Sequence, residues 1–199
     1  MHVAVVDPDV VEVPVRDRSR WLTAPSGLLL FACMFMPLFE SCGEASYPAQ
    51  AVASWPPHLL GALVALLALV GTPVTMRTWR GARGGATALV VVWSLVVAWF
   101  AMFAFSGDGL GGAALGLTAS LWLLIAAVLR RGDLHPRGFI PGARVGDLPR
   151  PRWSTGRLVA AMVVSMVAAA FALPWHPRPR PAPPPSTGEA APLFVWGGC

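Results

Sequence analysis

Four side chains with the chemistry of a reactive or metal site fall in one short stretch: Glu40, Cys42, Glu44 and His58. Carboxylate, thiolate and imidazole groups are metal ligands, and carboxylates and imidazoles also transfer protons. Their spacing matches no ligand pattern, and the sequence contains no Walker loop, HExxH, GxSxG or kinase signature. We therefore expect no catalytic residue, metal or cofactor, and we expect water to reach Glu40 and His58 in a polar loop.

The three cysteines, Cys33, Cys42 and Cys199, form no CxxC pair. Cys42 and Cys199 fall on the same side of the membrane in the topology derived below. In an oxidising compartment they are a candidate disulfide pair that would tie the end of the sequence to the first loop. Two separate thiols and an intermolecular bond are the alternatives.

Small residues recur every four positions in two apolar stretches. Residues four apart share one helical face, and small side chains on that face let transmembrane helices approach closely. The pattern predicts a helix-packing seam, either within this chain or with a partner subunit. Its members are Gly112, Gly116 and Ser120 in the first stretch and Ala161, Ser165 and Ala169 in the second.

The 15 basic residues are all arginine, and with ten acidic residues they give a net charge of +5. Arg130, Arg131 and Arg137 follow a long apolar stretch and are candidate contacts for anionic lipid headgroups, each worth about 1 kcal/mol near the surface. The alternative is that they only fix the topology of the chain. No nucleic-acid-binding motif or aromatic platform accompanies them, so we expect no nucleic-acid partner.

The composition identifies the elements that carry these residues. Hydrophobic residues make up 55% of the chain and charged residues 13%, against about 45–50% and about 25% in a soluble domain. Five stretches without an acidic or basic residue are close to the length of about 20 residues that spans a membrane as a helix. They do not alternate as a β-barrel requires. The prediction is an all-α, polytopic transmembrane bundle with spans at 21–39, 59–76, 87–105, 111–129 and 158–175.

Prolines and glycines mark the expected boundaries. Pro25 suits the first turn of the first span, and Pro37 should kink or end it. The glycine-rich stretch 77–85 is expected to be a loop between two helices, and 130–157 an irregular loop. A competing interpretation of the first span is a secretory signal ending in the lipobox-like sequence 30–33, which would leave four spans.

The arginines also predict the orientation. Thirteen of the 15 lie before the first span, between the second and third, and between the fourth and fifth. Because cytoplasmic loops are enriched in basic residues, these segments are expected to be cytoplasmic, in the cell membrane. Residues 1–20 would form a cytoplasmic segment and residues 176–199 a proline-rich extracytoplasmic tail. The apolar residues 193–196 in that tail are too few to span but could return to the membrane interface.

No site in the sequence defines a reaction, so the expected function is that of a non-enzymatic accessory or assembly subunit. One alternative is a small channel or carrier for a neutral or apolar solute. Another is a lipid-modifying enzyme that uses Glu40 and His58. The expected partners are membrane lipid and either another membrane protein or a second copy of this chain.

Overall fold

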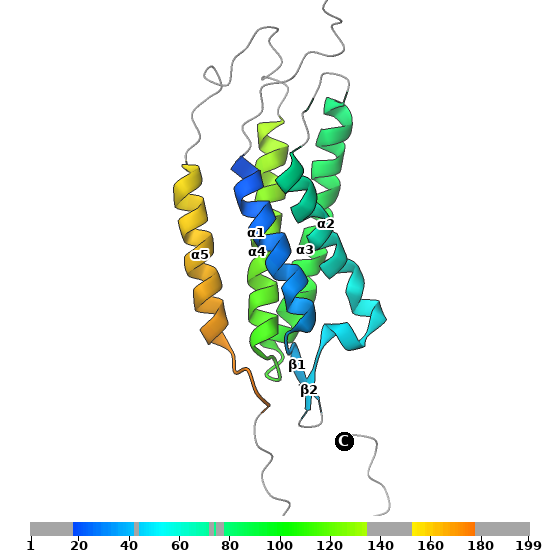
Figure 1. Ribbon diagram of the computed structural model, residues 1–199, viewed down its shortest axis with the longest axis vertical. Coiled ribbons are helices and arrows are strands. Elements are labelled where there is room, and N and C mark those ends of the chain that lie inside the picture. Colours follow the sequence, from blue (N-terminus) through cyan, green and yellow to red (C-terminus); the bar gives the residue numbers. More distant parts are fainter. Residues whose placement is uncertain (1–17, 42–43, 72–73, 75–77, 135–152, 178–199) are drawn as a thin grey trace, which may run out of the picture.

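The computed structural model describes residues 18–41, 44–71, 74, 78–134 and 153–177, and these residues form a bundle of α-helices (Figure 1). The predicted all-α class is confirmed. The five helices are α1 Arg18–Ala32, α2 Trp55–Val70, α3 Trp79–Phe105, α4 Gly111–Asp133 and α5 Thr155–Ala172.

Successive helices run antiparallel, so the bundle has two distinct ends (Figure 1). The arginine end contains the starts of α1, α3 and α5 and the last turn of α4, and these turns carry all the arginines in the described part of the chain. The hairpin end contains the turn from α3 to α4 and two short antiparallel strands, β1 Phe39–Ser41 and β2 Glu44–Ser46. The two chain segments that follow α1 and α5 both emerge at the hairpin end.

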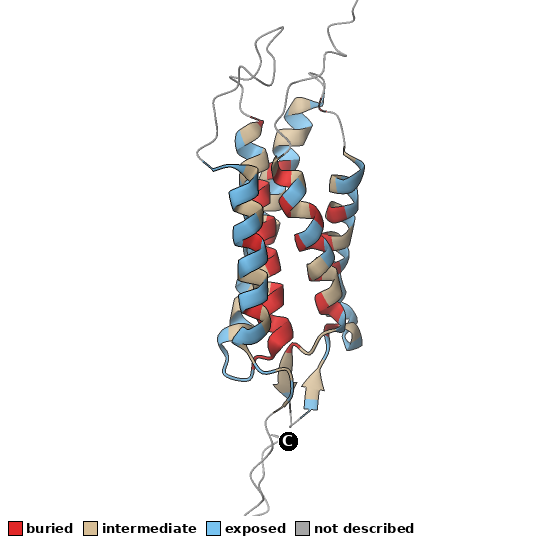
Figure 2. Cartoon of the chain, turned by 60° about the vertical axis from the view of Figure 1, so that its left-hand side comes forward, coloured by how far each residue is buried: buried red, intermediate tan, exposed pale blue. Residues whose placement is uncertain are grey.

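The centre of the bundle is the pair α1 and α4, because the closely packed helix pairs are α1 with α2, α1 with α4, α3 with α4, and α4 with α5. Buried residues follow the inward faces of these helices, and the outer faces are exposed (Figure 2). Gly116 of α4 lies against the ring of Phe100, where an added Cβ would be 2.1 Å from Cε1. Gly27 of α1 packs directly against the backbone carbonyl of Gly61 on α2.

Among the described residues, four helices are long and apolar enough to cross a membrane: Val52–Val70, α3, α4 and α5. The helix α1 has 15 residues, or about 22 Å at 1.5 Å per residue, and a 3₁₀ turn, η2 Cys33–Phe35, extends it. It lies beside α2 and α4 within the bundle. These findings define a transmembrane helical-bundle protein.

The end of the first predicted span, at residue 39, is wrong. Met36, which precedes Pro37, has an extended backbone, and Phe39 already belongs to β1, where it pairs with Ser46 of β2. The helix also begins at Arg18 rather than at Trp21, so Pro25 lies inside it and not in its first turn. Two further 3₁₀ turns, η3 Pro48–Gln50 and η4 Val52–Ser54, connect β2 to α2.

The second and third helices both begin earlier than predicted. Prolines occupy the first turn of α2, where a missing N–H costs nothing, and Gly71, with a φ of 71°, ends the helix. The stretch 77–85, expected to be a loop, is helical from Trp79 onward. Each of its exposed glycines costs about 1 kcal/mol relative to alanine, and the packing of Trp79 against Leu134 and Ala86 offsets this cost.

The last two helices are also displaced from their predicted bounds. The helix α4 continues four residues further, to Asp133, which forms an ion pair with Arg18. The helix α5 begins at Thr155 because the Ser154 hydroxyl accepts a hydrogen bond from the Arg157 N–H. It ends at Ala172, since a residue that precedes a proline avoids the helical conformation. Most of the predicted irregular loop, residues 135–152, lies outside the described residues.

Candidate functional site

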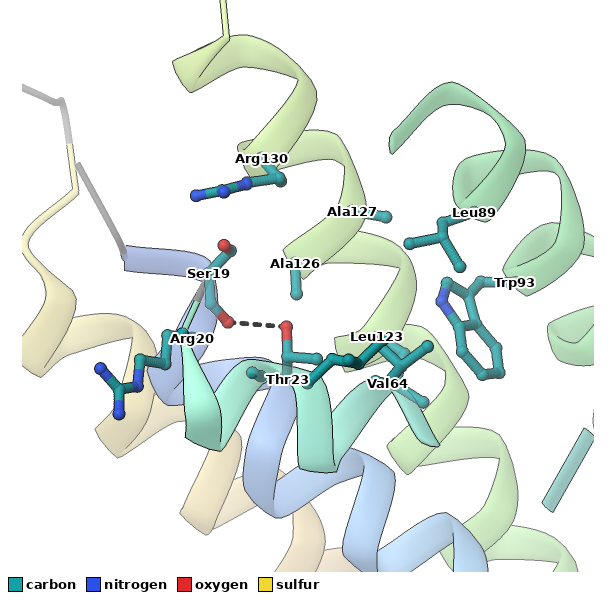
Figure 3. Close-up of a pocket in the computed structure, with 13 residues that line it drawn as sticks. Ser19, Arg20, Thr23, Val64, Leu89, Trp93, Leu123, Ala126, Ala127 and Arg130 are labelled. Carbon is teal, nitrogen blue, oxygen red and sulfur yellow. Dashed lines mark hydrogen bonds between the residues drawn. The ribbon is translucent and has the colours of Figure 1, made fainter. Parts of the chain in front are cut away.

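A pocket opens at the arginine end between α1, α2, α3 and α4, and it is named the arginine pocket here. Its volume is about 210 Å³. Charged and hydroxyl side chains lie along one side, and apolar side chains cover the rest (Figure 3). The polar lining residues are Ser19, Arg20, Thr23 and Arg130; the apolar ones are Val64, Leu67, Ala68, Leu89, Trp93, Leu123, Ala126 and Ala127, with Gly71 at the rim.

The two arginines of the pocket come from adjacent helices. Arg130 lies one turn before the end of α4, and its side chain extends toward Ser19 on α1 (Figure 3). Arg20 donates a hydrogen bond of 2.6 Å from Nη2 to the Leu69 carbonyl, which the end of α2 would otherwise leave without a helical partner. One nitrogen of the Arg20 guanidinium is therefore already hydrogen-bonded within the protein. Arg130 lies on the α4 side of the pocket, whereas the Arg20 guanidinium lies against the end of α2.

An ion pair stands beside the pocket and joins the same two helices. Arg18 Nη2 lies 2.6 Å from Asp133 Oδ1, and the side chains are 17% and 9% exposed. Arg18 Nε and Asp133 Oδ2 are buried and make no hydrogen bond. Asp133 neutralises Arg18, and the two arginines that line the pocket itself are Arg20 and Arg130.

The arrangement of charge above an apolar interior suits an anionic amphiphile. Guanidinium groups bind phosphate through two parallel hydrogen bonds, and the apolar walls below would hold methylene groups. The volume is below the range of about 300–1,000 Å³ for sites that enclose a whole drug-sized ligand. The pocket therefore has room for one part of a lipid, a headgroup or the start of a chain, rather than for a complete lipid.

The three arginines predicted as lipid contacts lie in different surroundings. Arg130 lines the pocket, Arg131 points outward and is exposed, and Arg137 lies outside the described residues. Sequence reasoning missed Arg20 and Ser19, which belong to the first turn of α1. The detectable signal was the cluster of arginines before the first apolar stretch, which was interpreted as topology only.

A second, larger cavity of about 570 Å³ lies at the hairpin end and is named the aromatic cavity. It is open to the outside and is lined by the hairpin, the 3₁₀ turns, the start of α2 and the end of α3. None of the side chains that line it carries a charge. They are Leu38, Phe39, Ser46, Tyr47, Pro48, Gln50, Ala51, Ala53, Ser54, Pro57, Trp99 and Phe103.

His58 is fully buried next to this cavity, so the expectation that water reaches it is wrong. Its ring makes edge-to-face contacts with Trp99 and Phe100 at centroid distances of 6.3 and 5.9 Å. Nδ1 lies 2.7 Å from the Ser54 carbonyl, which can only accept, so Nδ1 carries the hydrogen. Glu40 lies on β1, where its backbone N–H bonds to the Asp108 carbonyl at 2.8 Å. The loop that was expected to be polar and solvated therefore packs against α3, with the ring of Phe39 stacked on that of Phe103.

The structure places the two halves of the predicted seam in separate contacts. Gly112 lies against Pro37 and Gly116 against Phe100, so this stripe faces the first loop and α3. On α5, Ala169 is buried and Ser165 accepts a hydrogen bond of 2.7 Å from Trp122 Nε1, whereas Ala161 is exposed. Ser120 is buried within α4 and donates to the Leu117 carbonyl. A residue not predicted for the seam, Met162, is buried on α5 instead.

The predicted disulfide pair, Cys42 and Cys199, lies outside the described residues, and Cys33 is a buried free thiol. Within the ranges that the structure describes, no three His, Cys, Asp or Glu side chains gather where they could hold a metal ion. No known protein family, curated protein or solved structure matches this chain. The geometry of the two cavities is therefore the basis for a functional proposal.

Proposed function

We propose that this protein is a non-enzymatic membrane protein that binds an anionic lipid in the arginine pocket and serves as an accessory or assembly subunit. The observation that carries the proposal is the placement of Arg20 and Arg130 above an apolar pocket formed by four helices. Charge attracts the headgroup, and apolar walls favour the chain that follows it. A free phosphate ion would be attracted by the arginines but would gain nothing from the apolar walls.

The arginine end of the bundle also supports a proposed orientation of the protein in the membrane. Cytoplasmic leaflets carry anionic lipids, and juxtamembrane arginines are enriched on that side. We therefore place the arginine end at the cytoplasmic face of the cell membrane and the hairpin end outside. With this orientation, an impermeant thiol reagent applied to intact, reduced cells should label Cys199, and labelling only after lysis would contradict it.

The lipid proposal is tested by comparing two adjacent arginines of α4. Purified protein is placed in nanodiscs of phosphatidylcholine with increasing phosphatidylglycerol, and bound lipid is measured by native mass spectrometry. Arg130→Gln should weaken retention of phosphatidylglycerol about fivefold, since one arginine near the surface contributes about 1 kcal/mol. Arg131→Gln removes the same charge from an exposed position and should change retention less than twofold.

Two results would contradict the lipid proposal. If both substitutions reduce binding equally, general surface charge and not the pocket attracts the lipid. If wild-type protein retains phosphatidylcholine as well as phosphatidylglycerol, the arginines do not select an anionic headgroup. Inorganic phosphate added as a competitor separates recognition of the headgroup alone from recognition of a whole lipid.

The accessory role is tested by affinity purification from native membranes in a mild detergent, with mass spectrometry of the bound proteins. A stoichiometric membrane protein partner is the expected result. A protein that purifies alone, or only with a second copy of itself, would contradict the subunit role and leave lipid binding as the function.

Two alternatives draw less support from the described residues. For a channel or carrier, Val96 and Phe100 of α3 are buried between the two cavities, an arrangement that favours binding at each end over passage through the bundle. For a lipid-modifying enzyme, His58 is enclosed by aromatic rings and its Nδ1 is committed to the Ser54 carbonyl. A solute-transport assay in reconstituted vesicles would test the channel or carrier. A comparison of lipid turnover between the wild type and His58→Ala would test the enzyme.

A further inference from the structure

We propose that the apolar segment 193–196 of this chain folds back and occupies the aromatic cavity at the hairpin end. The segment reads Leu-Phe-Val-Trp and follows a proline-rich stretch after α5. This inference concerns the opposite end of the bundle from the arginine pocket and is independent of the proposed lipid site.

The chain leaves α5 next to the wall of the cavity. The Pro174 carbonyl accepts a hydrogen bond of 2.8 Å from the Gly111 N–H at the start of α4. The neighbouring Leu110 N–H donates to the carbonyl of Leu38, which lines the cavity, at 3.0 Å. Trp175 packs on Gly111 and donates from Nε1 to the Ala170 carbonyl at 2.8 Å. The described chain therefore ends, at Pro177, at the same end of the bundle as the cavity.

The length and composition of the connecting stretch allow the return. Fifteen residues, 178–192, separate the described chain from the segment, and they reach about 45 Å even in a polyproline conformation of 3.1 Å per residue. Ser186, Thr187 and Gly188 interrupt the prolines and favour a turn. The stretch before this turn, 178–185, and the stretch after it, 189–196, have equal lengths. A turn there brings 193–196 back toward the place where the chain left the bundle.

The cavity and the segment are chemically alike. The segment is uncharged and contains two aromatic residues, and the cavity has an uncharged lining that includes the rings of Tyr47, Trp99 and Phe103. Aromatic rings favour edge-to-face and offset-stacked contacts with one another. Because the segment is tethered, its effective concentration at the cavity is on the order of millimolar, which an independent peptide would not reach. Docking would also bring Cys199, three residues beyond Trp196, toward the hairpin end.

The test uses the full-length protein in phosphatidylcholine nanodiscs, with Cys42→Ser so that Cys199 has one designed partner. A cysteine is introduced at Ala51, which lines the cavity, and in a control protein at Ser106, which is exposed at the same end but outside the cavity. Copper phenanthroline oxidises two thiols to a disulfide, and the rate is followed on a non-reducing gel. Ala51→Cys should cross-link to Cys199 at least tenfold faster than Ser106→Cys. Equal rates, or no cross-link at Ala51→Cys, would overturn the proposal.

A second measurement identifies any other occupant of the cavity. The paired substitutions Phe194→Asp and Trp196→Asp change no residue of the five described helices, so helix content by circular dichroism should not change. They should lower the Ala51→Cys cross-linking rate at least tenfold and increase labelling of the cavity by a photoactivatable phosphatidylcholine. Equal lipid labelling with and without the two substitutions would show that lipid, and not the segment, fills the cavity, and would overturn the proposal.

Discussion

At the hairpin end, backbone hydrogen bonds join four separate segments, whereas at the arginine end the corresponding connections are made by side chains. The N–H groups of the residue before α4 and of its first two residues donate to the carbonyls of Leu38, Pro174 and Pro37 at 2.8–3.0 Å. At the other end, the carbonyl of Leu69, in the last turn of α2, accepts from Arg20, and that of Leu134, directly after α4, accepts from Trp79 Nε1. Arg18 and Asp133 add an ion pair between α1 and α4.

The two kinds of connection place different chemical groups at the two ends of the bundle. A helix leaves its first N–H and last C=O groups without partners, and both ends of this bundle satisfy such groups with atoms from other segments. Backbone carbonyls do so without any charge, and the cavity at the hairpin end has an uncharged lining. Arginines do so with a charge and further N–H donors, so the arginine end has a pocket that attracts anions. The same structural requirement thus produces two cavities with different preferences.

The largest expected effect tests the close backbone contact at the hairpin end. In Gly112→Val, the added Cβ would lie 2.4 Å from the Pro37 carbonyl oxygen, and neither backbone can move without breaking a hydrogen bond. The free energy of unfolding should fall by about 3 kcal/mol. Gly132→Val, on the same helix at the arginine end, has open space around it and should change stability by about 0.5 kcal/mol or less. Unfolding in mixed detergent and denaturant measures both, and equal losses would refute the contrast.

A smaller effect is expected from the ion pair at the arginine end. Asp133→Asn leaves Arg18 charged and largely buried, and should lower the free energy of unfolding by about 2 kcal/mol, less than for a pair in a dry core because water is close. The double variant Arg18→Met with Asp133→Leu removes both charges and should recover at least half of the loss. A double variant less stable than Asp133→Asn would show that the pair itself stabilises the helix contact.

The hydrogen bond from Trp79 should contribute less again. Trp79→Phe keeps an aromatic ring beside Leu134 but removes the 3.0 Å bond to its carbonyl, and should cost about 1 kcal/mol. Trp153→Phe removes the indole N–H from an exposed side chain and serves as the matched control, with no expected change. Thermal unfolding followed by circular dichroism compares the two, and similar losses in both variants would mean that Trp79 acts through its size alone.

The smallest expected effect is a gain. Gly84 and Gly85 lie in the first two turns of α3 and are exposed. No atoms lie near the position of an added Cβ at either residue. Alanine at either position should raise the free energy of unfolding by about 0.5–1 kcal/mol through helix propensity. The same thermal measurement applies. A loss of stability would show that α3 requires these glycines for a reason other than helix formation.

The class of fold and the approximate positions of the helices were predictable from the sequence, because uncharged stretches of this length have few other solutions in a membrane. The boundaries were predicted less well. The predicted first span extends past Pro37 into β1. The predicted third span starts eight residues after the first residue of α3, since glycines at 81, 84 and 85 indicate a loop when they are considered without the packing of Trp79. Local propensities of about 1 kcal/mol are easily reversed by tertiary contacts.

The candidate sites were only partly predictable. Arg130 was identified as a lipid contact, but nothing in the spacing separated it from Arg131, which faces outward, or joined it to Arg20. The burial of His58 was missed because two prolines and a polar stretch precede it, a pattern typical of a solvated loop. The contacts of Gly27 with Gly61 and of Gly112 with Pro37 required knowledge of which helix lies opposite.

The sequence by itself determined that this chain forms apolar helices, because residues without charge cluster in stretches long enough to satisfy their own backbone hydrogen bonds. Tertiary structure alone decided which side chains meet. Arg20 and Arg130 line the same pocket because α1 and α4 pack together antiparallel, and the aromatic cavity exists because the hairpin folds against α3. Helix formation depends on neighbours in the sequence, whereas each of these sites depends on residues from at least three separate segments.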